Sequence, residues 1–279
     1  MSKLSVCIPV YNGEAYIGET IGRVLKQTYQ DFELIVVDNA STDSTVRIVE
    51  AIQDKRIHLF VNERNVGMAG NWNRCLEKVD TEYIQILCAD DIIGENCLEE
   101  KMHYLEQNKD IALVFSASNV CDWKGKKIMG RRPFRGNRKF LGKKIIKKSF
   151  RKKNLYGEPS NVMFRKSAAK KAGEFDPLMG YNLDWEYWLR LSQHGNIGYI
   201  DKELSFFRIS AQSSTSNYLM KNRKVILKND RQFVEKCKKN REMGLSGTDI
   251  FIHVVAGRIQ LYLKILFLIF AQISARKGE

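Results

Sequence analysis

Two adjacent carboxylates, Asp90 and Asp91, come shortly after an apolar run over residues 83–87. A helical pattern of apolar residues follows them, from Leu98 to Leu105. Two acidic side chains at the carboxyl end of a buried strand lie where an open α/β sheet binds its ligand. Their combined charge needs a partner, and a divalent metal that carries a phosphate-bearing substrate is the most economical one. The alternative interpretation is a charged turn between a strand and a helix.

Polar residues also follow the three predicted strands that precede this run. Tyr11 and Asn12 come after the first strand, Asp38 comes after the second, and the turn after the third contains Asn65 and Gly67. A carboxylate such as Asp38 can accept the imide N–H of a uracil or thymine ring. Neither a GxGxxG nor a P-loop motif occurs, so dinucleotide and P-loop sites lose their main support. Any one of these residues alone suits a loop or a cap, but three consecutive turns of this kind favour a nucleotide site.

The apolar residues of the amino-terminal half alternate between two periodicities. Continuous apolar runs predict strands over residues 4–10, 32–37, 57–61, 83–87 and 111–115. Helical spacing between these runs predicts helices over residues 17–25, 46–52 and 67–78. Repeated βα units form a mainly parallel sheet, with helices on both faces and a ligand crevice at the carboxyl ends of the strands. We therefore predict an α/β fold with a mainly parallel, mixed sheet.

Composition is typical of a globular protein in a reducing compartment. With 279 residues, 44% of them hydrophobic, the chain is long enough to bury a full-sized core. Its six cysteines are scattered without a CxxC pair, and its four histidines lack the spacing of a zinc site. Met1 leads almost at once into a strand-like segment, LSVCIPV, instead of a secretory signal. We therefore expect a cytoplasmic protein.

The formal net charge of +14 is unevenly distributed. Lysines and arginines crowd the stretch from Lys124 to Lys153, and no acidic residue lies between Asp122 and Glu158. Such a block either contacts something anionic or stays solvated. The candidate partners are nucleic acid, the anionic face of a membrane and a phosphorylated acceptor. Aromatic residues for base stacking are sparse in the block, so nucleic acid is the least favoured of the three.

The carboxyl-terminal segment after Tyr218 is basic and has a helical pattern. Residues 250–273 include the run LYLKILFLIFAQI, but Arg258, Gln260 and Lys264 interrupt the apolar residues. A transmembrane span needs about 20 nearly unbroken apolar residues. We expect instead an amphipathic helix that lies on the membrane or packs on the main domain. Together with the basic block, it favours peripheral attachment at the inner face of the cytoplasmic membrane.

Several long stretches of the chain together carry a family resemblance. They are SVCIPVYNGEAYIGETIGRVLKQTYQDFELIVVDNASTDST, NVGMAGNWNRCLEKVDTEYIQILCADD, EPSNVMFRKSAAKKAGEFDP and GYNLDWEYWLRLSQHG. The chain resembles the family 2 glycosyltransferases with the GT-A fold up to about residue 214, over some three quarters of its length. The resemblance implies a GT-A, Rossmann-like domain over residues 1–215, with a nucleotide-sugar-binding half over 1–120 and an acceptor half over 121–215. A helical extension would occupy residues 216–279.

The resemblance also implies a role for each polar residue of the predicted crevice. Nucleotide contacts fall to Pro9, Tyr11, Asn12, Glu14, Asp38, Asn65, Gly67, Asn71 and Asp90. Among these, Asp38 would hold the base. Asp90 and Asp91 match the end of the family's motif for metal and ribose-phosphate. Asp184, in YNLDWEYWLR, occupies the position of the catalytic aspartate that takes the proton of the acceptor hydroxyl, although the residues alone would make it a helix N-cap.

Several positions depart from the pattern of the family. Cys88 stands where many members have the first acidic residue of the metal motif, and Leu183 replaces the glutamate that commonly precedes the base. Trp72 stands where an arginine near the pyrophosphate is frequent, and Ser210 replaces a histidine that can help at the metal. These departures suggest a divergent subgroup and, less strongly, a protein without catalysis.

The resemblance and the residues together predict a metal-dependent, inverting hexosyltransferase with Mn²⁺ or Mg²⁺ as its cofactor. We expect transfer from a nucleotide-diphosphate sugar, with a UDP-sugar favoured, to a hydroxyl of a saccharide acceptor. A lipid-linked precursor of a surface glycan is the expected acceptor. A divalent cation on the pyrophosphate would stabilise the charge that develops on the leaving group. The alternative is a non-catalytic protein that binds a nucleotide sugar or nucleic acid.

Overall fold

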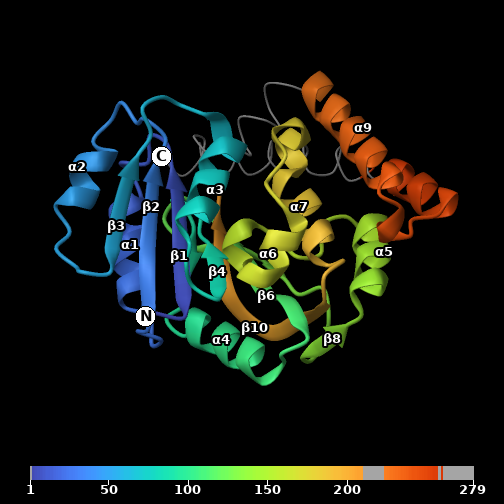
Figure 1. Cartoon of the computed structure of the whole chain (residues 1–279), viewed down its shortest axis with the longest axis horizontal. Coiled ribbons are helices and arrows are strands. Elements are labelled where there is room, and N and C mark those ends of the chain that lie inside the picture. The colour runs from blue at the N-terminus through green and yellow to red at the C-terminus, as the bar shows by residue number, and fades with distance from the viewer. Residues whose placement is uncertain (1, 210–222, 257–258, 260–279) are drawn as a thin grey trace.

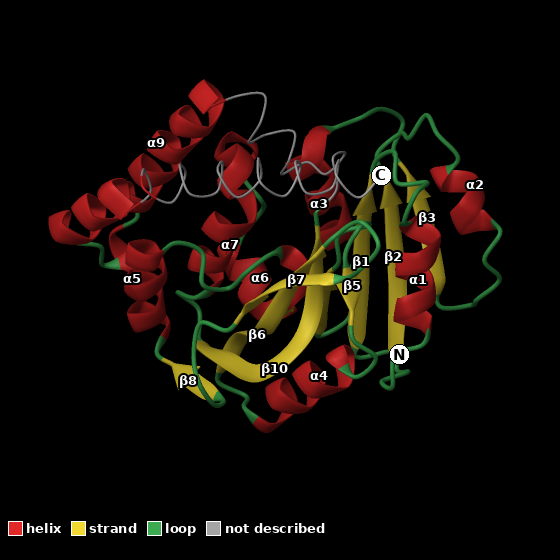
Figure 2. Cartoon of the chain, turned by 180° about the vertical axis from the view of Figure 1, so that it is seen from behind, coloured by secondary structure: helices red, strands yellow, loops and turns green. Residues whose placement is uncertain are grey.

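The computed structural model describes residues 2–209, 223–256 and 259. One mixed sheet forms its centre, and helices cover both faces, as Figures 1 and 2 show from opposite sides. The predicted α/β class is confirmed. The amino-terminal half supplies β1 (Leu4–Val10), β2 (Phe32–Asp38), β3 (Ile57–Val61), β4 (Tyr83–Ile86) and β5 (Ile92–Ile93). The remaining strands are β6 (Ile111–Cys121), β7 (Lys127–Arg131), β8 (Arg138–Phe140), β9 (Val162–Arg165) and β10 (Asn196–Arg208).

The sheet is parallel on one side and mixed on the other. Its order is β3-β2-β1-β4-β9-β6-β10-β5, with β7 beside β6 and β8 beside β10. Strands β1 to β4 run parallel to their neighbours in this set, so their carboxyl ends share one edge of the sheet. The direction reverses at β9, which is antiparallel to both β4 and β6. Strands β1, β2 and β4 are buried on both faces, which explains their continuous apolar runs, whereas β3 at the edge is partly exposed.

Two apolar clusters, one on each face, attach the helices to the sheet. The first face carries α1 (Ile17–Leu25), α2 (Thr45–Glu50) and α4 (Cys97–Gln107). The opposite face carries α3 (Gly67–Lys78), α5 (Gly142–Lys152), α6 (Lys166–Ala172) and α7 (Leu183–Leu191). Adjacent residues of β1 divide between the clusters, because successive side chains of a strand point to opposite faces.

A group of aromatic rings joins the carboxyl-terminal helices to α5 and α7. Helix α9 (Arg223–Lys239) contributes Phe233, whose ring centroid lies 4.7 Å from that of Trp185. A further helix over residues 247–256 contributes His253, which stacks at 4.3 Å on Phe150 of α5. Short 3-10 helices η1 (Pro159–Asn161), η2 (Pro177–Asn182) and η3 (Arg241–Met243) complete the structure.

The carboxyl-terminal extension is helical in the part that the structure describes. Most of the predicted segment 250–273 lies outside the described residues, because residues 257–258 and 260–279 are not among them. Among the described helices, none combines the length and the apolar character needed to cross a bilayer.

Strand β5 and the strands from β7 to β10 were not predicted from the sequence. Strand β5 follows the acidic pair directly and pairs antiparallel with β10, where Ile92 faces Phe206. Within the block from Lys124 to Lys153, β7 and β8 precede α5. Strand β7 pairs with the end of β6 directly before it, where Ser118 faces Arg131, whereas β8 pairs with β10 far away in the chain. Both are short and lack a continuous apolar run, so neither leaves a clear strand pattern.

Helix α5 begins at a glycine that has no room for a side chain. A Cβ on Gly142 would overlap the backbone oxygen of Ser192 and lie 2.6 Å from that of Gly195. Gly142→Ala should therefore lower the free energy of unfolding by about 1–3 kcal/mol, the usual range for overpacking. Gly22→Ala is the control, because a Cβ at this position in α1 meets nothing within 4 Å. It should stabilise by about 0.4–1 kcal/mol. Equal urea-unfolding midpoints for the two variants would contradict this account of the packing.

Candidate functional site

The loops after β1 and β2 are joined by side chains of the predicted site. The backbone N–H of Asn12 donates to Ser41 Oγ at 2.8 Å, and Asn12 Oδ1 accepts from the N–H of Thr42 at 2.8 Å. Glu14 Oε2 accepts from the N–H of Ser44 at 2.9 Å. Asn12 has a positive φ of 51°, a conformation that asparagine tolerates better than most residues. Asn12 and Glu14 therefore fix the loop after β1 against the loop after β2, on one side of the predicted nucleotide site.

A network of amides supports the next loop along the edge. Asn39 Nδ2 donates to Asn65 Oδ1 at 3.0 Å, and Asn65 Oδ1 also accepts from the N–H of Gly67 at 2.9 Å. Asn71 Nδ2 donates to a carbonyl oxygen of β2 at 3.0 Å, while Asn71 Oδ1 accepts from Asn62 Nδ2 at 3.0 Å. Gly67 has a φ of +77°, and a Cβ there would meet only open space. Asn65 and Asn71 thus hold the strand ends, and Gly67 leaves the adjoining space open.

The carboxylate of Asp38 is only half satisfied. Its Oδ1 accepts from the N–H of Ser41 at 2.8 Å. Its Oδ2 is buried and finds no hydrogen-bond partner within the described part of the chain. Buried carboxylate oxygens are normally paired, so this one indicates a donor supplied by a ligand. Nearby on β1, Pro9 is buried in the strand and Tyr11 is 49% exposed at its end.

The acidic pair after β4 divides into a buried and an accessible carboxylate. Asp91 is 1% exposed. Its Oδ2 accepts from Ser160 Oγ at 2.5 Å, and its Oδ1 accepts from the N–H of Arg208 at 3.1 Å. Asp90 is only partly buried. Burial, and then the charge of Asp90, raise the pKa of Asp91 well above its ordinary value, and burial also raises the pKa of Asp90. A cation beside the pair would reverse this penalty.

The thiol of Cys88 lies among three carboxylates. Burial raises its pKa well above the ordinary value, and the charges of Asp91, Asp90 and Asp184 act in the same direction. All three predicted acidic residues are therefore close enough to Cys88 for their charges to act on its thiol. A neutral thiol is no ligand for a hard cation. The described residues contain no group of three or more His, Cys, Asp or Glu side chains placed to hold a metal ion.

Asp184 lies in the first turn of α7, on the face of the sheet that also carries α3, α5 and α6. Its Oδ1 accepts from the N–H of Trp185 at 2.7 Å, and its Oδ2 accepts from Asn154 Nδ2 at 3.4 Å. The side chain is partly exposed. In both views α7 lies toward the edge at which β1 to β3 end (Figures 1 and 2). A partly exposed carboxylate at a helix N-terminus is held in one orientation and can still accept a proton.

Two of the residues that depart from the family pattern lie in the hydrophobic core. Trp72 belongs to the core, where its ring packs edge-on against Phe175 at 5.1 Å. Leu183 is also buried in the core. Ser210 lies outside the described residues.

Sequence reasoning missed two residues that hold the acidic pair, Ser160 and Arg208. Ser160 is the hydroxyl residue of the EPSN stretch, and its Oγ also accepts from the N–H of Cys88 at 3.1 Å. The guanidinium of Arg208 donates to Glu19 Oε2 at 2.8 Å and to the carbonyl oxygen of Trp123 at 3.0 Å. For Ser160 the available signal was a hydroxyl directly before an apolar strand, whereas Arg208 contacts Asp91 through its backbone N–H, which no side-chain pattern records.

A fully buried lysine supports Ser160 from behind. Lys101 of α4 donates weakly to Gln85 Oε1 at 3.3 Å and to the carbonyl oxygen of Ser160 at 3.4 Å. Gln85 Nε2 donates to the same carbonyl oxygen at 2.6 Å. Burial lowers the pKa of Lys101. The segment that holds Asp91 is therefore itself fixed by buried hydrogen bonds.

The profile of the family described as "Glycosyl transferase family 2" matches residues 5–173. An uncharacterized glycosyltransferase of Methanocaldococcus jannaschii is 34% identical over 226 residues, which are 79% of this chain and 74% of that protein. An uncharacterized glycosyltransferase of Haemophilus influenzae is 39% identical over 132 residues, 46% of this chain and about half (52%) of that protein. The crystal structure of Staphylococcus aureus TarS 1-349 in complex with UDP-GlcNAc has a similar fold. Its TM-score is 0.71 at 19% identity, over 91% of this chain and 71% of that one.

The raised pKa of Asp91 predicts a dependence of stability on pH. The native state holds this proton more tightly than the unfolded chain, so it loses stability as the pH rises from 3.8 through the native pKa. Asp91→Asn should therefore raise the Tm of the metal-free protein at pH 8, and the gain should vanish near pH 3.8.

Asp249→Asn is a control of opposite sign. Although burial acts to raise it, hydrogen bonds from Ser246 and Arg151 lower the pKa of Asp249. Its contribution to stability is present above the unfolded pKa and is lost as the pH falls, so the variant should melt earlier at pH 8. A lower Tm for Asp91→Asn at pH 8 would show that the Asp91 charge is compensated in the native state.

Proposed function

Because the chain belongs to glycosyl transferase family 2 and has the GT-A fold, we propose that it transfers a sugar from a nucleoside-diphosphate sugar to an acceptor hydroxyl. The observation that carries the donor class is the buried, unpaired Oδ2 of Asp38 at the strand edge. The imide N–H of uracil supplies the donor that this oxygen lacks, whereas cytosine has no imide N–H. A UDP-sugar is therefore the favoured donor.

The nucleotide site has an accessible side and a supporting side. Tyr11 and Gly67 form the accessible side, because one is half exposed and the other borders open space. Asn12, Glu14, Asn65, Asn71 and Pro9 keep that side in place through the loops and strand that they hold. Asp90 follows β4, on the other side of β1 from Asp38, and we assign the ribose-phosphate part of the nucleotide to this side.

A divalent cation, Mn²⁺ or Mg²⁺, fits the acidic pair. Asp90 offers a carboxylate that is partly open, and Asp91 adds its charge from a fixed position. Phosphate oxygens of the donor would complete the set of hard oxygen ligands. When bound, the metal neutralises charge on the leaving diphosphate.

The transfer itself needs one base, and we assign this role to Asp184. As the acceptor hydroxyl oxygen bonds to the anomeric carbon, its proton passes to the carboxylate of Asp184. The bond between that carbon and the diphosphate oxygen breaks, and the electron pair leaves with the nucleoside diphosphate. A single displacement from the opposite side inverts the configuration. Asn154 and the first turn of α7 orient Asp184 for this step.

The variant Asp184→Asn tests whether Asp184 acts as the general base or only caps the start of α7. The amide keeps the size and the hydrogen-bonding positions but loses basicity, so transfer should fall by roughly 10²- to 10⁴-fold. Calorimetric affinity for UDP and the melting temperature should stay nearly unchanged.

Asp90→Asn is the matched variant in the donor site. It should keep the base but lose the tightening of UDP binding by Mn²⁺. Transfer is measured as sugar incorporated into the acceptor. If Asp184→Asn transfers at nearly the wild-type rate, Asp184 has a structural role and another residue is the base.

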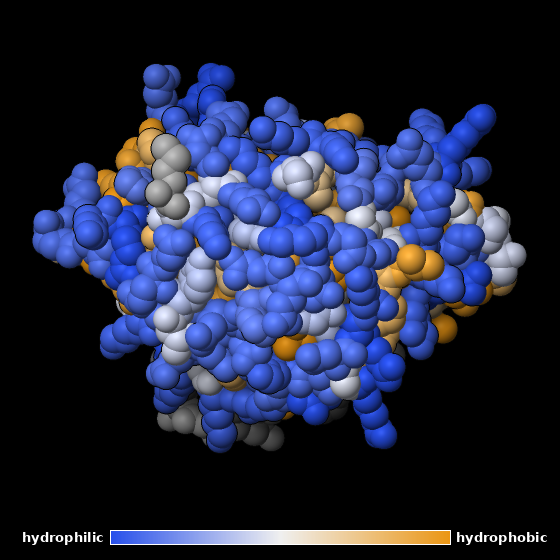
Figure 3. Space-filling model, turned by 60° about the horizontal axis from the view of Figure 1, so that its bottom comes forward, coloured by the Kyte–Doolittle hydropathy of each residue, from blue (hydrophilic) through white to orange (hydrophobic). Residues whose placement is uncertain are grey.

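We also propose a lipid-linked saccharide as the acceptor and an anionic membrane as the place of work. Helix α5 exposes lysines of the basic block, namely Lys143, Lys144, Lys147, Lys148 and Lys152. It packs on the helix over 247–256, where Phe251 and Val255 lie four residues apart and are 68% and 45% exposed. An apolar line beside a basic helix suits an anionic bilayer. By contrast, the face seen in Figure 3 is largely hydrophilic.

Flotation with liposomes tests this surface. Binding to anionic vesicles should fall steeply with salt and with the double change Phe251→Ser and Val255→Ser, because neither signal alone anchors firmly. Val61→Ser is the control, since Val61 is 54% exposed on β3 at the other side of the sheet. Equal binding to neutral and anionic vesicles would leave the basic block as a solvated face, and salt-sensitive binding of oligonucleotides without transfer would favour the non-catalytic alternative.

A further inference from the structure

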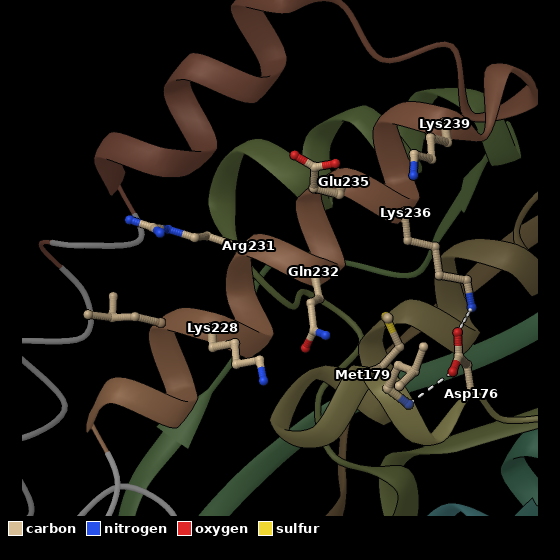
Figure 4. A pocket seen from close by; sticks show the side chains of 10 residues that line it. Asp176, Met179, Lys228, Arg231, Gln232, Glu235, Lys236 and Lys239 are labelled. Carbon is tan, nitrogen blue, oxygen red and sulfur yellow. Dashed lines mark hydrogen bonds and ion pairs between the residues drawn. The ribbon is translucent and has the colours of Figure 1, made fainter.

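A cleft between α9 and η2 is separate from the residues of the proposed donor site. It measures about 670 Å³ and is lined by Asp176, Leu178, Met179, Leu227, Lys228, Arg231, Gln232, Glu235, Lys236 and Lys239. This volume is within the range of sites that bind small molecules. No residue of the donor site borders it. Figure 4 shows α9 along one side of the cleft and η2 along the other.

The wall formed by α9 carries two adjacent strips of side chains. Lys228, Gln232, Lys236 and Lys239 recur at the spacing of one helix face, and Leu227, Arg231 and Glu235 form the neighbouring strip. In Figure 4 Lys228 and Gln232 project toward η2. The cleft is therefore lined by cations over most of the length of α9.

These cations differ in whether their charge is already balanced. Lys236 pairs with Asp176 at 2.6 Å and with the buried Glu186 at 3.0 Å, so its charge is spent within the fold. Lys228, Arg231 and Lys239 have no acidic partner at ion-pair distance in the part of the chain that the structure describes. Unbalanced cations around a concave surface attract an anion.

Apolar side chains from both walls also line the cleft. Leu178 is 63% exposed and Leu227 is 46% exposed, while Met179 is buried behind them. Exposed leucines on both sides of a cleft stay in water unless an apolar ligand covers them. A free nucleotide or a nucleic acid backbone would satisfy the cations but not the leucines. A ligand with a phosphate at one end and an apolar chain at the other satisfies both.

We propose that this cleft binds the phosphate ester of an amphiphilic acceptor. Lys228 and Arg231 hold the phosphate, and Leu178, Met179 and Leu227 contact the first part of the apolar chain. This inference rests on the proposed transfer to a lipid-linked saccharide and gives that acceptor its own site. Segment η2 leads directly into α7, which carries Asp184. A saccharide on the bound phosphate therefore starts from the side of the molecule that holds the proposed base.

Calorimetry with farnesyl phosphate, farnesol and inorganic phosphate tests the proposal on the full chain, below the micellar concentration of each probe. Farnesyl phosphate should bind. Farnesol lacks the phosphate and inorganic phosphate lacks the apolar chain, so each should bind at least about tenfold more weakly than farnesyl phosphate. The double change Lys228→Ala and Arg231→Ala should lower the affinity for farnesyl phosphate by about tenfold or more. Leu178→Ser should weaken farnesyl phosphate and leave inorganic phosphate unchanged.

Lys238→Ala is the matched control, because Lys238 is exposed on the same helix but does not line the cleft. It should bind farnesyl phosphate like the unchanged protein, and UDP affinity should be the same in every variant. Absence of farnesyl phosphate binding, equal binding of farnesol, or equal losses in Lys238→Ala would overturn the proposal. If the unchanged protein binds farnesyl phosphate but neither binds UDP nor transfers a sugar, the proposed function is wrong and the assignment of the cleft still holds.

Discussion

The arrangement of the site depends on the buried carboxylate of Asp91. It accepts a hydrogen bond from Ser160, 69 residues further along the chain, and another from the N–H of Arg208, 117 residues away. A buried carboxylate is costly unless such donors meet it, and here burial still raises its pKa. A bound cation would offset this cost, and the partly exposed Asp90 beside it is the carboxylate to which we assign the metal.

The surroundings of Asp91 are built to keep it in place. Lys101 and Gln85 hold the carbonyl oxygen of Ser160 from behind, and the guanidinium of Arg208 is held by Glu19 of α1. Each of these contacts crosses between elements, so the strand edge behaves as one preorganised surface. Catalysis gains from such preorganisation, because the protein then needs little rearrangement when charge develops on the leaving group.

The carboxyl-terminal helices are joined to α5 and α7 by aromatic rings as well as by ion pairs. Phe150, Trp185, Phe233 and His253 stack between α5, α7, α9 and the helix over 247–256. This packing places the proposed base, the cleft of α9 and the basic helix α5 in a single rigid part of the molecule. An acceptor anchored by its lipid and its phosphate would therefore meet a base in a fixed position, which is how binding energy at a distance supports a chemical step.

The sequence by itself determined the elements whose pattern is local. The apolar runs of β1 and β3 and the helical spacing of α1 and α3 predicted these elements correctly, since burial on one or two faces imposes a period on neighbouring residues. The family resemblance named Asp38, Asp90 and Asp184, and in the structure the charges of the latter two act on the thiol of Cys88. Only the tertiary structure decided that Ser160 and Arg208 hold Asp91, that β5 pairs with β10, and that α9 faces η2 across a cleft. Their partners lie many residues apart, and no local period records a contact that exists only after the chain has folded.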